Sequence, residues 1–145
     1  MKQLLLRIAL SATFLSAIAS RFGFWGNQSS GWSGFLEYTS EVCAWASKNI
    51  VPLLAFSATI LETIFALLLL IGYKTKWVAA GASLLTLFFA ISMTYSMGLK
   101  EPLDYSVFVF SAAAFLLSGM REYKWSVDEY LIKRKLSLNK TKHTS

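Results

Sequence analysis

The sequence predicts an all-α fold: a bundle of four transmembrane helices with a short amphipathic helix in the outer loop and a basic cytoplasmic tail. Two observations carry this prediction. Of the 145 residues, 55% are hydrophobic and only 15% are charged, a composition unlike that of soluble domains. Long uncharged runs also recur along the chain. We expect a transmembrane domain over residues 1–120 and a separate tail over residues 121–145.

Four apolar segments account for the predicted helices. They are Leu4 to Ser20, Val51 to Gly72, Trp77 to Met97 and Tyr105 to Met120. The second and third are long enough to cross a bilayer. The first and fourth are at or below the usual lower limit, so they need local thinning of the bilayer or flanking anchor residues. We expect Arg7 in the first segment to snorkel to the cytoplasmic interface.

The first segment also has features of a secretory signal peptide. Lys2 precedes the apolar stretch, and Ala17-Ile18-Ala19 resembles a small-residue cleavage site. Against cleavage, Arg7 interrupts the stretch, and removal of residues 1–19 would leave only three helices. We therefore expect the segment to be retained.

The basic residues predict the orientation in the membrane. Two flank the first segment, two lie in the turn after the second, and seven follow Met120, whereas only Arg21, Lys48 and Lys100 fall on the other side. Lys and Arg are concentrated on the cytoplasmic side of membrane proteins. Both termini are therefore expected in the cytoplasm. The net charge of +6 then requires no nucleic acid partner.

The connection over residues 21–50 is predicted to contain the amphipathic helix. Phe35, Tyr38, Val42 and Trp45 recur at three- and four-residue spacing, which places them on one helical face. Two interpretations remain open. The helix can form an aromatic belt at the membrane interface without a ligand, or it can cover the mouth of the bundle as a lid.

The tail after Met120 combines aromatic and basic residues. Tyr123, Trp125 and Tyr130 precede the run Lys133-Arg134-Lys135. This pattern is typical of an interfacial helix attracted to anionic lipid, and a docking site for a cytoplasmic partner is the alternative. We expect residues 137–145 to be disordered.

Glu62 is the most informative single residue, because it is the only charged residue between Val51 and Gly72. A carboxyl group near the bilayer midplane is costly and usually functional. In one interpretation it is neutral, hydrogen-bonds to a hydroxyl and fixes the helix register. In the other it pairs with a ligand or a cation, for which Arg21 is the nearest candidate. Small residues share the face of Glu62 and predict close helix packing there.

Asp104 lies at the predicted entrance of the fourth helix, two residues after Pro102. We expect it to be the N-cap of that helix, where its carboxylate would satisfy free amides and complement the helix dipole. The alternative is a role in a site at the outer mouth.

Several kinds of cofactor chemistry are excluded within one chain. Cys43 is the only cysteine and His143 the only histidine, so a disulfide, a CxxC redox pair, a bis-His haem site or a zinc cluster cannot form. We expect no metal and no covalently bound cofactor. If the protein takes part in redox chemistry, another subunit or a diffusible cofactor must carry the electrons.

A set of short motifs accompanies the apolar segments. They are Arg21-Phe22-Gly23, Trp25-Gly26, Glu62, Gly72-Tyr73-Lys74-Thr75, Phe89-Ala90-Ile91-Ser92-Met93 and the run from Lys100 to Phe108, of which Pro102 to Phe108 is the most specific part. Together they resemble the DoxX family of small bacterial membrane proteins. The resemblance implies four transmembrane helices with the first retained, in the inner membrane of a bacterial cell. It also implies an association with membrane redox systems, because the family name derives from a subunit of an archaeal quinol-oxidising or thiosulfate:quinone oxidoreductase complex.

A quinone site is therefore one functional hypothesis. A quinone needs an apolar slot, an aromatic wall and one or two hydrogen-bonding groups, which could come from Glu62, Arg21, Trp25, Ser92, Tyr95 and Tyr105. The chain would then be an accessory or quinone-interacting subunit that contacts the lipid bilayer and other oxidoreductase subunits. The alternative is a non-catalytic scaffold, or a carrier of protons or small hydrophobic solutes. The sequence leaves self-association open.

Overall fold

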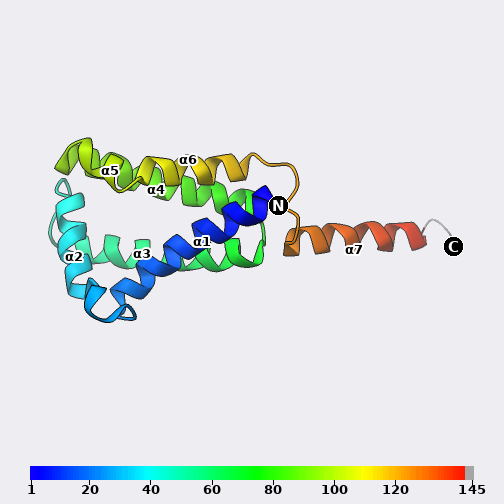
Figure 1. The fold of residues 1–145 in the computed structure, drawn as a ribbon, viewed down its shortest axis with the longest axis horizontal. Coiled ribbons are helices and arrows are strands. Elements are labelled where there is room, and N and C mark those ends of the chain that lie inside the picture. The colour runs from blue at the N-terminus through cyan, green and yellow to red at the C-terminus, as the bar shows by residue number, and fades with distance from the viewer. Residues whose placement is uncertain (143–145) are drawn as a thin grey trace.

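The fold is a bundle of antiparallel helices with one helix projecting from its base (Figure 1). The computed structural model describes the backbone of residues 1–142 and the side chains up to residue 137. The bundle consists of α1 (Lys2–Arg21), α3 (Val51–Ile71), α4 (Thr75–Met97) and α6 (Val107–Ser118). The shorter elements are η1 (Gly26–Gln28), α2 (Gly31–Val42) and α5 (Lys100–Asp104), and α7 (Val127–Lys142) follows the bundle.

The four bundle helices form a closed ring. α1 packs against α3 and α6, and α4 packs against the same two helices from the opposite side. α2 and α5 lie at one end, called the α2 end below (Figure 1). The chain start, the α3–α4 turn and α7 lie at the other, called the α7 end.

The predicted membrane character is supported by three helices. Among the described residues, α1, α3 and α4 are long and apolar enough to cross a bilayer. The fourth predicted segment, Tyr105 to Met120, is shorter than expected, because α6 has 12 residues and spans only about 18 Å. Ser106, at φ 55°, breaks the helix between α5 and α6. The apolar run is thus divided rather than continuous.

The small-residue face of α3 is buried as predicted. Ala55, Ala58, Thr59, Glu62 and Ala66 are all buried. α1 does not bury a matching stripe of small residues, because Ala9, Ala12 and Ser16 are exposed. α1 buries its larger residues instead, among them Leu10 and Phe14. Large side chains on one helix fill the space left by small ones on its neighbour, so two small stripes are not needed at the same contact.

Hydroxyl groups join the helices inside the bundle. Ser11 of α1 donates a hydrogen bond of 2.7 Å to the carbonyl of Ala66 on α3. Ser83 of α4 and Ser111 of α6 each donate to the other's carbonyl at 2.9 Å. In an apolar environment such bonds satisfy groups that would otherwise be desolvated without a partner, and they hold the helices in register.

Arg7 does not snorkel to solvent, which corrects the expectation from sequence. Only 1% of Arg7 is exposed. Its guanidinium donates hydrogen bonds of 3.0 Å to the carbonyls of Leu69, Leu70 and Trp125. The last carbonyls of a helix have no partner within that helix, so Arg7 caps the end of α3. The cap requires glycine at Gly72, because a Cβ there would overlap the guanidinium and the backbone is left-handed.

The start of α7 is fastened to the same end of the bundle. Asp128 accepts hydrogen bonds of 2.8 Å from the backbone amides of Lys74 and Thr75 and so caps α4. Its own amide donates to the carbonyl of Gly72 at 3.0 Å. α7 continues to Lys142, so residues 137–142 form a helix where the sequence predicted disorder. Residues 143–145 of that predicted tail lie outside the described residues.

Candidate functional site

A buried ion pair joins α1 to α3 near the α2 end. Arg21 is the last residue of α1, and its Nη2 lies 2.6 Å from Oε2 of Glu62 on α3. Only 7% of Arg21 and 4% of Glu62 are exposed. The structure therefore brings together the two charged residues that the sequence analysis singled out. Burial removes the hydration of both groups, so each depends on the other for compensation.

The guanidinium of Arg21 is held on two further sides. Nη1 donates a hydrogen bond of 2.8 Å to Oγ1 of Thr59, which lies nearly one turn before Glu62 on the same face of α3. The ring of Phe35 on α2 lies 3.7 Å from Cζ of Arg21, a cation–π contact. Oε2 of Glu62 is buried and makes no aligned hydrogen bond with any described residue. This oxygen lies against Nη2 of Arg21, and a carboxylate oxygen can accept a further hydrogen bond.

The ion pair lines a cavity of about 170 Å³, which is called the head cavity below. Arg21 and Glu62 form its charged wall, and Tyr38 and Thr39 contribute hydroxyl-bearing side chains from α2. The remaining walls are apolar or sulfur-bearing and are built by Phe35, Val42, Cys43, Phe89, Met93 and Val107. A largely apolar cavity with a few converging polar groups is the usual form of a small-molecule site.

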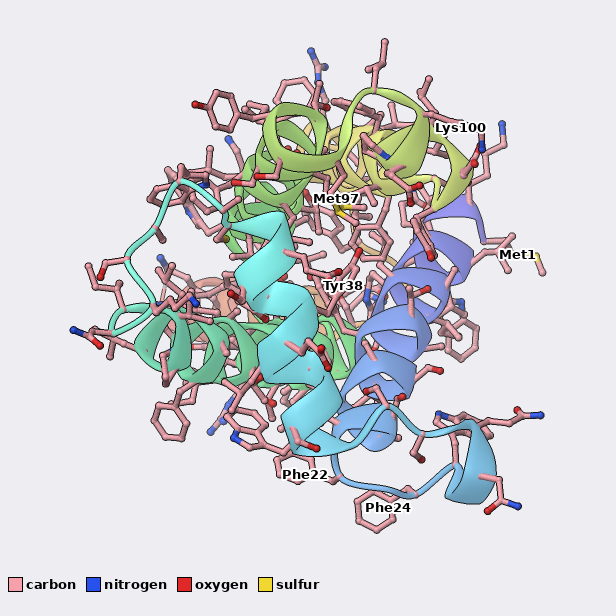
Figure 2. All side chains as sticks on the ribbon, turned by 90° about the vertical axis from the view of Figure 1, so that its left-hand side faces the viewer. Met1, Phe22, Phe24, Tyr38, Met97 and Lys100 are labelled. Carbon is pink, nitrogen blue, oxygen red and sulfur yellow. The ribbon has the colours of Figure 1, made fainter. Side chains whose placement is uncertain are left out.

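α2 covers this end of the bundle. In the end-on view of Figure 2, α2 crosses in front of the bundle helices. Tyr38 lies on the side of α2 that faces the centre of the bundle. The Tyr38 hydroxyl donates a weak hydrogen bond to Sδ of Met93 on α4 at 3.8 Å. Partial burial, helped by the nearby Tyr105 and Glu101, raises the pKa of Tyr38, so its hydroxyl remains a hydrogen-bond donor to a higher pH than that of a free tyrosine.

The other predicted site residues are not brought to the head cavity. Ser92 is buried close by and accepts a hydrogen bond of 3.4 Å from Nε1 of Trp45. Trp25 is half exposed, and its Nε1 donates to the carbonyl of Ser16. Tyr95 and Tyr105 are 77% and 65% exposed. Hydrogen-bonding capacity alone thus did not identify the lining, because the direction of each side chain depends on helix rotation.

Asp104 is neither a helix cap nor part of the cavity. It is the last residue of α5 and forms an ion pair with Lys100, one turn earlier on the same helix. α6 has no side-chain cap, and its N-cap residue is Ser106. The extra turn of helix formed by α5 moves Asp104 from the predicted helix start to an exposed helix end.

The cavity residues contributed by α2 were not predicted as site residues from the sequence, which assigned this helix to an interfacial belt or a lid. Phe35, Tyr38 and Val42 were recognised as one helical face, and all three line the head cavity. Cys43 follows the same helix and is 2% exposed. Burial raises the pKa of the Cys43 thiol, against a smaller lowering effect of the Ser92 hydroxyl. The three- and four-residue spacing indicated that these residues share one face of a helix. It did not indicate that this face lines a cavity.

Comparison with known families adds one finding. The family model named DoxX matches residues 2–95, which is more than half of the chain. The chain belongs to the DoxX family. No curated protein and no solved structure matched in the corresponding searches.

The DoxX match covers most of the cavity. It includes α1, α2, α3 and nearly all of α4, and therefore the Arg21–Glu62 pair and the lining from α2. It ends before the run Pro102 to Phe108, which the sequence analysis treated as the most specific part of the resemblance. Together with the three apolar helices, membership of the DoxX family identifies a multi-pass membrane protein that contacts the lipid bilayer.

Proposed function

We propose that the protein binds the head group of a quinone in the head cavity and acts as an accessory subunit of a membrane oxidoreductase system. The observation that carries this proposal is the joining of a buried Arg21–Glu62 pair to an aromatic and apolar cavity of about 170 Å³. Such a volume suits a single ring and is smaller than a site for a drug-sized molecule.

The polar groups match the two oxidation states of a quinone. A quinone carbonyl oxygen accepts hydrogen bonds, which Arg21 and Tyr38 can donate. A quinol hydroxyl donates, and the buried Oε2 of Glu62, which has no aligned donor among the described residues, can accept. Glu62 is also the group that can exchange a proton with the bound ring. The chain supplies binding and proton handling, while electrons come from another membrane or cytoplasmic subunit.

The orientation follows from the charge pattern and the path of the chain. We infer that α5 and α6 together make the fourth crossing, because the chain runs through them from the α2 end towards the α7 end (Figure 1). The α7 end is then cytoplasmic and the head cavity lies towards the periplasmic side of the inner membrane. α2 acts as a lid over the cavity.

Quinone retention tests this proposal. Protein purified in mild detergent should release quinone on solvent extraction, and Glu62→Gln should lower the amount retained at least about tenfold while the protein still assembles. Glu37→Gln is the matched control, because Glu37 is an exposed residue of α2 and should leave retention unchanged. Full retention by Glu62→Gln, or wild-type protein that neither retains nor binds added quinone, would reject the proposal.

A non-catalytic role is favoured by a different observation. Arg21 already binds Glu62 and Thr59 of α3, so the pair can fasten two helices without any ligand. In that case the protein is a scaffold, or a carrier of protons or small hydrophobic solutes, and Glu62→Gln lowers thermal stability without any effect on quinone. Loss of the ion pair lowers the melting temperature under either function, so quinone retention is the measurement that separates the two.

A further inference from the structure

A second cavity adjoins the head cavity on the side of α3 and α4. It also has a volume of about 170 Å³, and it is called the tail cavity below. Phe35, Thr39, Cys43 and Phe89 line both cavities, so the two cavities lie side by side and meet at these residues. The rest of the tail cavity is lined almost entirely by apolar side chains of α3 and α4, with Ser57 as the only hydroxyl.

The tail cavity reaches the membrane-facing surface of the bundle. Leu61 of α3 and Phe88 of α4 line it and are 40% and 45% exposed. Ser57, on the same wall, is also exposed. These residues lie within two of the helices that are long and apolar enough to cross a bilayer, so the exposed rim faces lipid rather than water.

The helix arrangement explains why an opening lies here. α3 and α4 are joined by a tight turn at the α7 end, and α2 is placed across them at the other end (Figure 1). Trp45 packs edge-on against Phe88 with ring centroids 6.0 Å apart, which holds the chain after α2 against α4. α2 and this segment lie over the cavity at the α2 end, and Leu61 of α3 and Phe88 of α4 form its exposed rim.

The geometry points to an amphiphilic ligand that enters sideways from the bilayer, with its polar ring beside Arg21 and Glu62 and its hydrophobic tail leaving through the tail cavity between α3 and α4. This inference rests on the proposed function and specifies the ligand class: a membrane-resident lipid with a long tail, rather than a water-soluble molecule. A polar end beside an ion pair and an apolar end open to lipid are the two surfaces that such a molecule requires.

Another open hollow lies on the bundle but does not serve this route. It is lined by Ile60 together with residues of α1, α2 and α3, and it shares no lining residue with the head cavity. Ile60 and Leu61 are neighbours on α3 with nearly equal exposure, 43% and 40%. They face different hollows, so the same substitution at each position gives a matched pair.

The test compares two quinone analogues, one consisting of the ring alone and one carrying a ten-carbon tail, by calorimetric titration of detergent-solubilised protein. Leu61→Trp should weaken binding of the tailed analogue at least about tenfold and change binding of the ring alone less than about twofold. Ile60→Trp should change neither. Ser57→Trp, at a second exposed position on the wall of the tail cavity, should reproduce the effect of Leu61→Trp.

Three outcomes would overturn the inference. They are an equal loss of both analogues in Leu61→Trp, a loss of the tailed analogue in Ile60→Trp, or no change in Leu61→Trp and Ser57→Trp. Failure of the proposed function looks different, because wild-type protein would then bind neither analogue.

Discussion

Arg21 and Glu62 are 41 positions apart in the chain, yet their charged atoms lie 2.6 Å apart and both are buried. The pair joins the end of α1 to the middle of α3, and α2 stacks the ring of Phe35 on the guanidinium. Three elements therefore meet at one guanidinium. We expect substitutions at this position to affect both the stability of the bundle and the proposed ligand binding.

Removing one member of the pair should be worse than removing both. Arg21→Met or Glu62→Leu leaves a buried charge without compensation and should cost about 3 to 5 kcal/mol, whereas the double variant should lose clearly less than the sum. Thermal or denaturant unfolding in detergent measures the difference. The exposed pair Lys100 and Asp104 is the control, and its loss should cost no more than about 1 kcal/mol. Additive effects at Arg21 and Glu62 would show that they do not act as a unit.

Arg7 should control how firmly α7 is attached to the bundle. Arg7→Met removes the donors for the carbonyls of Leu69, Leu70 and Trp125 and should destabilise the protein by at least about 2 kcal/mol. Trypsin should then cleave faster after Lys124, and backbone amides near Ser126 should exchange faster. Lys2→Met, which alters an exposed residue at the same end, should leave both rates unchanged. Equal cleavage rates in all three proteins would contradict the capping role.

Cys43 should report on occupancy of the head cavity. Because burial raises the pKa of this thiol, the neutral form persists to higher pH than in a free cysteine, whose pKa is about 8.5. Alkylation by a small uncharged maleimide should therefore be slow at pH 7 and accelerate only at higher pH. The ring-only quinone analogue should slow it further.

Cys43 is the only cysteine, so the labelling signal has a simple control. Cys43→Ser should remove the label completely. Rapid alkylation at pH 7, at the rate of a free thiol, would mean that the α2 end is open rather than covered.

The proposed orientation can be tested with single cysteines in a Cys43→Ser background. Gln28 and Lys76 are both exposed and lie near opposite ends of the bundle. A membrane-impermeant maleimide added to intact cells with a permeable outer membrane should label Gln28→Cys and not Lys76→Cys, because basic residues concentrate at the α7 end. Lysed cells should label both. The reverse pattern in intact cells would place the termini outside.

Some features of this protein follow from local sequence alone. The apolar runs around α1, α3 and α4 are long, and the backbone of such a segment can satisfy its hydrogen bonds in lipid only as a helix. The buried face of α3 follows from the same reasoning, since a lone Glu62 among alanines is stable only where neighbouring helices cover it. The pairing of Glu62 with Arg21 was one of two open alternatives, and depth in the membrane already favoured Arg21 as the cation.

Other features were decided only by the tertiary structure. Arg7 looked like an interfacial residue, but the end of α3 and the chain before α7 present carbonyls to it from more than 60 residues away. Tyr95 and Tyr105 had suitable chemistry but point outwards, whereas Tyr38 and Thr39 reach the cavity because α2 lies across the bundle. Helix formation depends on interactions within a few residues, whereas helix rotation and the placement of a loop helix depend on packing between distant segments. That packing determines which polar groups share a cavity.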